Sequence, residues 1–116
     1  LQEVDITFTT DISKPGVIDP GSQIMVIRQN LAREINAWIN YRQCLTMESA
    51  NGLTSWTVGC AENLPMRIRD ISFTLHTYVA KHVPMHLLLS RPFQQLLLSR
   101  LEDFPNGKVE LSICDP

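Results

Sequence analysis

The sequence predicts a mostly β domain with a barrel-like or sandwich-like core and one or two short helices. Two observations lead to this prediction: apolar and polar residues alternate in several short segments, and turn-forming residues recur between those segments. The chain has 116 residues without internal repeats, low-complexity stretches or linkers, so we expect one domain over residues 1–116.

The first predicted element is a hairpin that ends in a tight turn. Apolar and polar residues alternate from Val4 to Thr9, as in a half-buried strand. Residues 14–16 read Lys-Pro-Gly, which predicts a turn, and a second strand begins at Val17. That strand leads into residues 19–22, Asp-Pro-Gly-Ser, whose central Pro and Gly would by themselves suit a type II β-turn. The pattern therefore places one carboxylate, that of Asp19, at the end of a strand.

The middle of the chain predicts a buried strand, a short helix and a hairpin. Residues 24–27 are apolar and largely β-branched, which favours a strand buried on both faces. Residues 29–35 contain good helix formers, with Leu31 and Ile35 four residues apart. Two β-rich stretches then flank an Asn-Gly pair, the strongest short hairpin signal, so we expect a protruding hairpin over residues 43–60 with its tip at Asn51 and Gly52.

The last part of the chain predicts a second hairpin, a buried strand and a helix. Residues 66–68 and 71–79 are strand-like on either side of a turn at residues 69–70. The apolar run 87–89 lies between two prolines and is too short for a helix, so we expect a buried strand. Pro92 suits the first turn of a helix that continues to Leu98, and a final strand is predicted over residues 109–113.

Composition excludes several classes of function. The chain is 44% apolar and 19% charged with a formal net charge of -2, which gives no electrostatic basis for binding nucleic acid or an anionic membrane. Its longest apolar run falls far short of the roughly 20 residues that span a bilayer. We therefore expect neither nucleic acid nor membrane as a partner, and we expect a cytoplasmic, intracellular domain of a longer protein.

The cysteines and histidines do not predict a metal site. Cys44, Cys60 and Cys114 lack the spacing of zinc ligands, and buried free thiols are the simplest interpretation. His82 and His86 are four residues apart, but the proline at position 84 opposes the helix that would bring them together. We expect no metal and no cofactor.

Three features occur in an order that resembles a known family. They are Asp19 in a glycine turn, the Asn51-Gly52 hairpin, and residues 87–93, Leu-Leu-Leu-Ser-Arg-Pro-Phe. Each feature alone is weak, but their order and separation over nearly the whole chain resemble retropepsin-like aspartic proteases, particularly the protease domains of retrotransposon polyproteins, including fungal ones.

The resemblance implies a fold, an activity and a set of site residues. It implies an acid-protease barrel that forms a C2 homodimer, in which Asp19 is the catalytic residue and two subunits supply a proton-sharing pair of aspartates. The active-site loop would comprise Pro20, Gly21 and Ser22; the tip of the flap would be Ala50, Asn51 and Gly52; and Leu89, Ser90 and Arg91 would form the structural motif beside the loop. The substrate would be an extended peptide or polyprotein segment, with Ile24, Leu53 and Met85 as candidates for its apolar pockets.

Two residues depart from the family's pattern and leave a second interpretation open. Pro20 stands where the family has Ser or Thr, and it offers neither a hydroxyl nor a backbone N–H. Ser90 stands where the family has Gly. The alternative is therefore a protease-like peptide-binding or dimerisation module with impaired catalysis.

Overall fold

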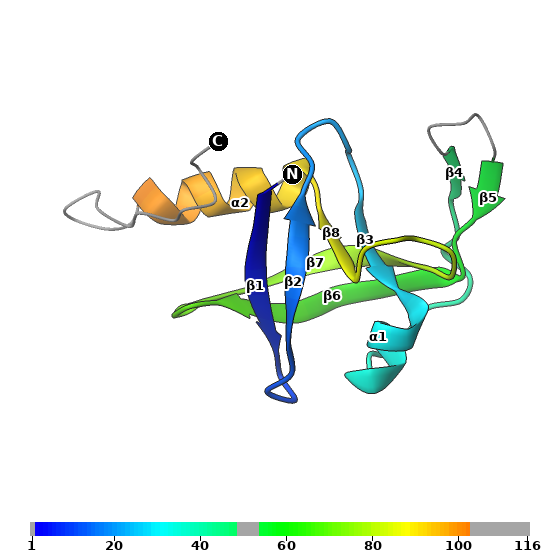
Figure 1. Ribbon diagram of the computed structural model, residues 1–116, viewed down its shortest axis with the longest axis horizontal. Helices are drawn as coiled ribbons and strands as arrows, with labels where there is room; N and C mark the ends of the chain where they lie inside the picture. The colour runs from blue at the N-terminus through cyan, green and yellow to red at the C-terminus, as the bar shows by residue number, and fades with distance from the viewer. Residues whose placement is uncertain (1, 49–53, 103–116) are drawn as a thin grey trace.

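The computed structural model describes residues 2–48 and 54–102, and its main body is a closed six-stranded barrel with two helices (Figure 1). The strands are β1 Gln2–Phe8, β2 Ser13–Ile18, β3 Met25–Arg28, β4 Thr46–Glu48, β5 Thr54–Trp56, β6 Gly59–Ile68, β7 Ile71–Ala80 and β8 Leu87–Leu89; the helices are α1 Gln29–Glu34 and α2 Arg91–Glu102. The barrel order is β1-β2-β8-β3-β7-β6, and β4 pairs with β5 in a separate two-stranded sheet. The predicted mostly β barrel with short helices is confirmed.

Alternating apolar residues of the strands fill the barrel. Ile6, Ile27 and Leu87 are fully buried, and burial of such a side chain stabilises a fold by about 1.5–3 kcal/mol. Helix α2 adds Phe93, whose ring centroid lies 5.6 Å from that of Phe73 on β7. The contact fixes the start of α2 against the barrel, close to the end of β8.

The first hairpin turns earlier than the sequence predicted. Residues 14–16 lie inside β2, and the turn falls at residues 9–12, where Asp11 adopts a φ of 62°. An aspartate tolerates this left-handed conformation better than most residues. Pro15 is accommodated because β8 pairs with β2 only from Gly16 onward, which leaves a free strand edge beside the proline.

Within the described residues, the other predicted elements agree with the structure except at β6. The buried strand at residues 25–28, the helix at 29–34, the buried strand at 87–89 and the helix that begins near Pro92 are all present. Strand β6, however, begins at Gly59 rather than at Met66. The pairing register shifts between Ala61 and Leu64, and Asn63 adopts a φ of 50°. This irregularity interrupts the alternation of apolar and polar residues from which a strand is predicted.

Strand β8 lies between β2 and β3, and this arrangement creates the candidate site. It runs parallel to β2, with Ile18 opposite Leu89, and antiparallel to β3, with Val26 opposite Leu88. Strands β2 and β8 therefore end at the same edge. The loop from β2 to β3 crosses the end of β8 at the point where α2 begins.

Two further findings concern the predicted C-terminal strand and the helices. The predicted final strand at residues 109–113 and its preceding turn lie outside the described residues. Among the described helices, none has the length and apolar character needed to cross a membrane.

Candidate active site

Asp19 is the first residue beyond β2, and the barrel holds its backbone in place. Its N–H donates to the carbonyl of Leu89 at 3.0 Å, which continues the pairing of β2 with β8 by one residue. Its carboxylate is partly exposed, and Oδ1 accepts a hydrogen bond from the Gly21 N–H at 3.0 Å. The bond from Gly21 therefore fixes the orientation of the carboxylate at the strand end, where it remains partly exposed to solvent.

Residues 19–22 form the predicted turn, but it is not of type II. The Ser22 N–H donates to the Asp19 carbonyl at 3.3 Å, as in a β-turn. Gly21 lacks the positive φ that a type II turn requires at this position. A Cβ at Gly21 would lie 3.3 Å from Asp19 Oδ1, so the glycine keeps space beside the carboxylate.

Residues at the junction between β8 and α2 form hydrogen bonds with the Asp19 loop. Besides the Leu89 carbonyl, the Arg91 N–H donates to the Ser22 carbonyl at 3.1 Å, and the Ser90 hydroxyl donates to the carbonyl of Ile24. Ser90 is fully buried. The structure thus brings together two of the predicted groups, Asp19 to Ser22 and Leu89 to Arg91.

Pro20 is exposed and borders an apolar pocket of about 470 Å³. Ile18 lies beside it on β2, and Phe93 and Leu97 line the pocket from α2. Leu98, also at this pocket, is 58% exposed. An apolar surface therefore adjoins the loop that carries Asp19.

The hairpin of β4 and β5 stands at the position predicted for the flap. It rises on the same side of the barrel as the β2–β3 loop (Figure 1), with Thr46 opposite Trp56. At its base, Leu45 and Thr57 exchange two hydrogen bonds of 2.8 Å. Trp56 is 70% exposed, which excludes its packing in the core. The predicted tip, Ala50 to Gly52, and the pocket candidate Leu53 lie outside the described residues.

A close backbone approach joins the segment between α1 and β4 to β6. Asn40 and Cys60 exchange backbone hydrogen bonds of 2.8 and 3.0 Å. A Cβ at Gly59 would come within 2.8 Å of the Asn40 carbonyl oxygen, so only glycine permits this packing.

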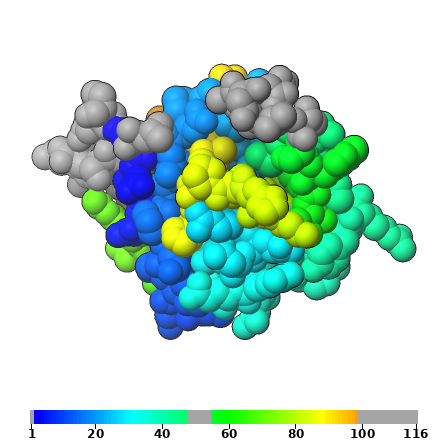
Figure 2. Space-filling model, turned by 45° about the vertical axis from the view of Figure 1, so that its right-hand side comes forward, coloured from blue at the N-terminus to red at the C-terminus, as the bar shows by residue number. Residues whose placement is uncertain are grey.

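Arg28 is a structural residue that the sequence analysis missed. Its Nε donates to the Val83 carbonyl at 3.0 Å, and Nη2 donates to the Pro84 carbonyl. These bonds hold the segment 81–86, which includes the half-buried pocket candidate Met85. Figure 2 shows the segment in yellow, between the N-terminal strands and the green hairpin strands. No local pattern could have identified Arg28, because its partners lie 55 and 56 residues away.

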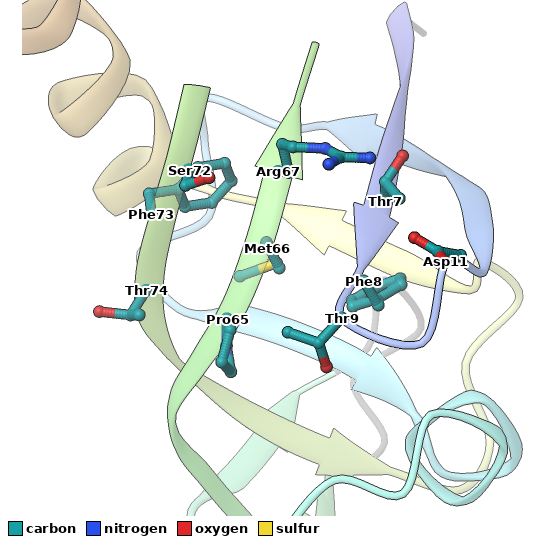
Figure 3. Close-up of a pocket in the computed structure, with 10 residues that line it drawn as sticks. All are labelled: Thr7, Phe8, Thr9, Asp11, Pro65, Met66, Arg67, Ser72, Phe73 and Thr74. Atoms are coloured by element: carbon teal, nitrogen blue, oxygen red, sulfur yellow. The ribbon is translucent and has the colours of Figure 1, made fainter. Parts of the chain in front are cut away.

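Two other hollows lie apart from the Asp19 carboxylate. Ile24, the remaining pocket candidate, is half-buried and lines a pocket of about 350 Å³ with His76 and Pro92. A pocket of about 450 Å³ lies beside the β1–β2 turn, at the opposite end of β2 from Asp19. In Figure 3 the Arg67 side chain points from β6 toward Thr7 on β1 within this second pocket.

The two cysteines within the described residues, Cys44 and Cys60, differ in exposure, and Cys114 lies outside the described residues. Cys44 is exposed, Cys60 is buried, and both are free thiols. The expectation of a buried thiol is thus correct for Cys60 and wrong for Cys44. Within residues 2–48 and 54–102, no group of three or more His, Cys, Asp or Glu side chains could hold a metal ion.

Comparison with known proteins shows the fold. No protein-family model and no curated protein sequence matches the chain. Among solved structures, the chain is similar to the retroviral protease-like domain of Ddi1 from Leishmania major, with a TM-score of 0.63 and 16% sequence identity. The match covers 84% of this chain and 74% of that one, and it shows that the barrel has a retropepsin-like fold.

Proposed function

We propose that this chain is an aspartic endopeptidase of the retropepsin type that acts as a C2 homodimer on extended peptide segments. The observation that carries the proposal is the position of Asp19. Its carboxylate stands at the end of a barrel strand, on a loop held by β8 and α2, in a barrel with a retropepsin-like fold.

The chemistry requires two carboxylates that share one proton. One acts as a base toward the attacking water, and the other donates a proton to the peptide carbonyl; repulsion between like charges separates their pKa values. One chain offers one aspartate in this loop, so a second subunit related by a two-fold axis would supply the other. The apolar surface around Pro20, Leu97 and Leu98 adjoins the loop and suits such an interface.

Pro20 is compatible with this role. The N–H groups that fix the turn belong to Asp19, Gly21 and Ser22, so the missing N–H of Pro20 removes none of them. A proline also favours an extended conformation at the preceding residue, and Asp19 continues the pairing of β2. These contacts favour a competent site over the impaired module.

The substrate would lie between the Asp19 loop and the β4–β5 hairpin. The hairpin would close over an extended peptide and exclude water from the scissile bond. Cleavage of a retrotransposon polyprotein in the cytoplasm, with this domain as one of its segments, is the setting that we propose.

The test is the Asp19→Asn variant. We expect pepstatin-sensitive peptide cleavage with an acidic optimum in the wild type, because one carboxyl of the pair must be protonated, and a loss of at least about a thousandfold in Asp19→Asn.

Asp11→Asn is the matched control. Asp11 is an exposed aspartate in the turn at the other end of β2, and asparagine tolerates its φ of 62°. This variant should retain full activity. Unchanged cleavage by Asp19→Asn would exclude the mechanism.

A further inference from the structure

Three hydrogen bonds connect the Asp19 loop to the segment 89–91, and they are not equivalent. The Leu89 carbonyl and the Arg91 N–H use backbone groups, which almost any residue supplies. The third bond comes from a side chain, the Ser90 hydroxyl, which donates to the carbonyl of Ile24. Of the three bonds, the one to the Ile24 carbonyl therefore depends on which side chain stands at position 90.

The surroundings of Ser90 make its hydroxyl important. Ser90 is 0% exposed, so its hydroxyl depends on a protein acceptor, and that acceptor is the Ile24 carbonyl. Its N–H contacts the sulfur of Met25 at 3.3 Å, and its carbonyl accepts the Phe93 N–H at 3.1 Å at the start of α2. Both backbone groups of Ser90 therefore have partners, and these contacts fix the position from which its hydroxyl binds the loop.

The carbonyl of Ile24 is where the loop rejoins the barrel, directly before β3. Within the loop, the Ser22 hydroxyl also donates to this carbonyl, at 3.2 Å. A bond within the loop restrains its shape but not its position on the barrel. The Ser90 hydroxyl connects the Ile24 carbonyl to the junction of β8 and α2, which the bond within the loop does not do.

We infer that Ser90 is a positioning residue for the Asp19 carboxylate. Its hydroxyl fixes the β3 end of the loop, while the Leu89 carbonyl fixes the β2 end, so that Asp19 is held between two anchored points. The kinetic consequence rests on the proposed protease function; the effect on the loop itself does not.

The experiment compares Ser90→Ala with Thr77→Val. Thr77 is also fully buried, and its hydroxyl donates to the Leu75 carbonyl at 3.1 Å on β7. Both variants remove one buried hydroxyl that donates to a backbone carbonyl. Only Ser90 is bonded to the Asp19 loop.

The first readout is hydrogen exchange. The amides of Asp19, Gly21 and Ser22 should exchange about fivefold faster in Ser90→Ala, the factor expected for one lost hydrogen bond, with no change in Thr77→Val. Equal exchange in wild type and Ser90→Ala would overturn the inference, whether or not the protein cleaves peptides.

The second readout is steady-state peptide cleavage. Ser90→Ala should lower kcat about tenfold and change KM less than about twofold, because the loop would present the carboxylate less accurately without losing peptide contacts. The Ser90→Cys variant keeps a side chain of similar size with a weak hydrogen-bond donor. Its kcat should lie between those of the wild type and Ser90→Ala. An equal loss of kcat in Thr77→Val would identify a general stability effect instead. Retained activity in Asp19→Asn would refute the proposed function and leave the exchange result to decide the role of Ser90.

Discussion

At the residue scale, the Asp19 turn forms without a side-chain hydroxyl or a backbone N–H at position 20. The Asp19, Gly21 and Ser22 amides make the hydrogen bonds of the turn. Pro20 contributes a fixed φ that suits the first central position of a β-turn. The hydrogen bonds of this turn therefore form although Pro20 takes no part in them.

Cys60 gives a prediction on pH dependence. Burial raises the pKa of its thiol, the nearby Glu62 carboxylate adds to the rise, and a hydrogen bond with the Thr77 backbone opposes it. Above the ordinary thiol pKa, the unfolded chain loses this proton first and so binds fewer protons than the folded chain. Stability therefore falls as pH rises through this window, up to the raised pKa of the folded state.

The measurement is the urea midpoint at neutral and at alkaline pH. The wild type should lose more stability on alkalinisation than Cys60→Ala. Cys44→Ala is the control and should follow the wild type, because Cys44 is exposed. An equal loss in all three proteins would contradict the assignment.

At the element scale, side chains from distant parts of the chain hold segments that have no regular structure. Arg28, the last residue of β3, binds the carbonyls of Val83 and Pro84. Its own N–H donates to the His86 carbonyl at 2.9 Å. One residue therefore fixes the path from β7 to β8, and so the point at which β8 enters between β2 and β3.

Arg28→Met should loosen the segment 81–86. Lys81 is exposed within it and provides a trypsin site, so cleavage after Lys81 should accelerate about fivefold if one hydrogen bond is lost and more if both are. The readout is the rate of this cleavage in the native protein, followed by mass spectrometry.

Arg33→Met is the matched control. Arg33 is an exposed residue of α1. Its removal should leave cleavage after Lys81 unchanged. Equal rates in wild type and Arg28→Met would show that other contacts hold the segment.

At the scale of the whole molecule, the proposed activity depends on two copies. The barrel presents Asp19 at one edge, and the apolar surface beside Pro20 lies at that same edge. A two-fold axis there would bring the two aspartates together and cover this surface at once. Assembly and catalysis would then be parts of one event.

Subunit mixing tests this dependence. If each active dimer needs two Asp19 carboxylates, an equal mixture of wild type and Asp19→Asn leaves about one quarter of randomly paired dimers active. Activity per wild-type subunit should then fall to about half its value. Mixing with Asp11→Asn should cause no such loss. If the total activity of the mixture with Asp19→Asn were instead proportional to the fraction of wild-type subunits, the active site would lie within a single chain.

The sequence by itself determined the local features. Continuous apolar runs predicted β3 and β8, helix formers with apolar residues four apart predicted α1, and Pro92 predicted the start of α2. All of these signals come from neighbouring residues. The Val-Ile-Asp-Pro-Gly-Ser pattern likewise placed Asp19 at a strand end. The first turn and the start of β6 were misplaced, since a left-handed residue at Asp11 and an irregularity near Asn63 leave little trace in the alternation.

Only the tertiary structure decided how the site is held. The insertion of β8 between β2 and β3, the hydrogen bond from Ser90 to the Ile24 carbonyl and the hold of Arg28 on residues 83–84 all join segments far apart in the chain. Their geometry is set when the barrel closes and β8 is paired on both sides. A local pattern carries no information on that closure, so the sequence named the candidate carboxylate and the fold supplied the structure around it.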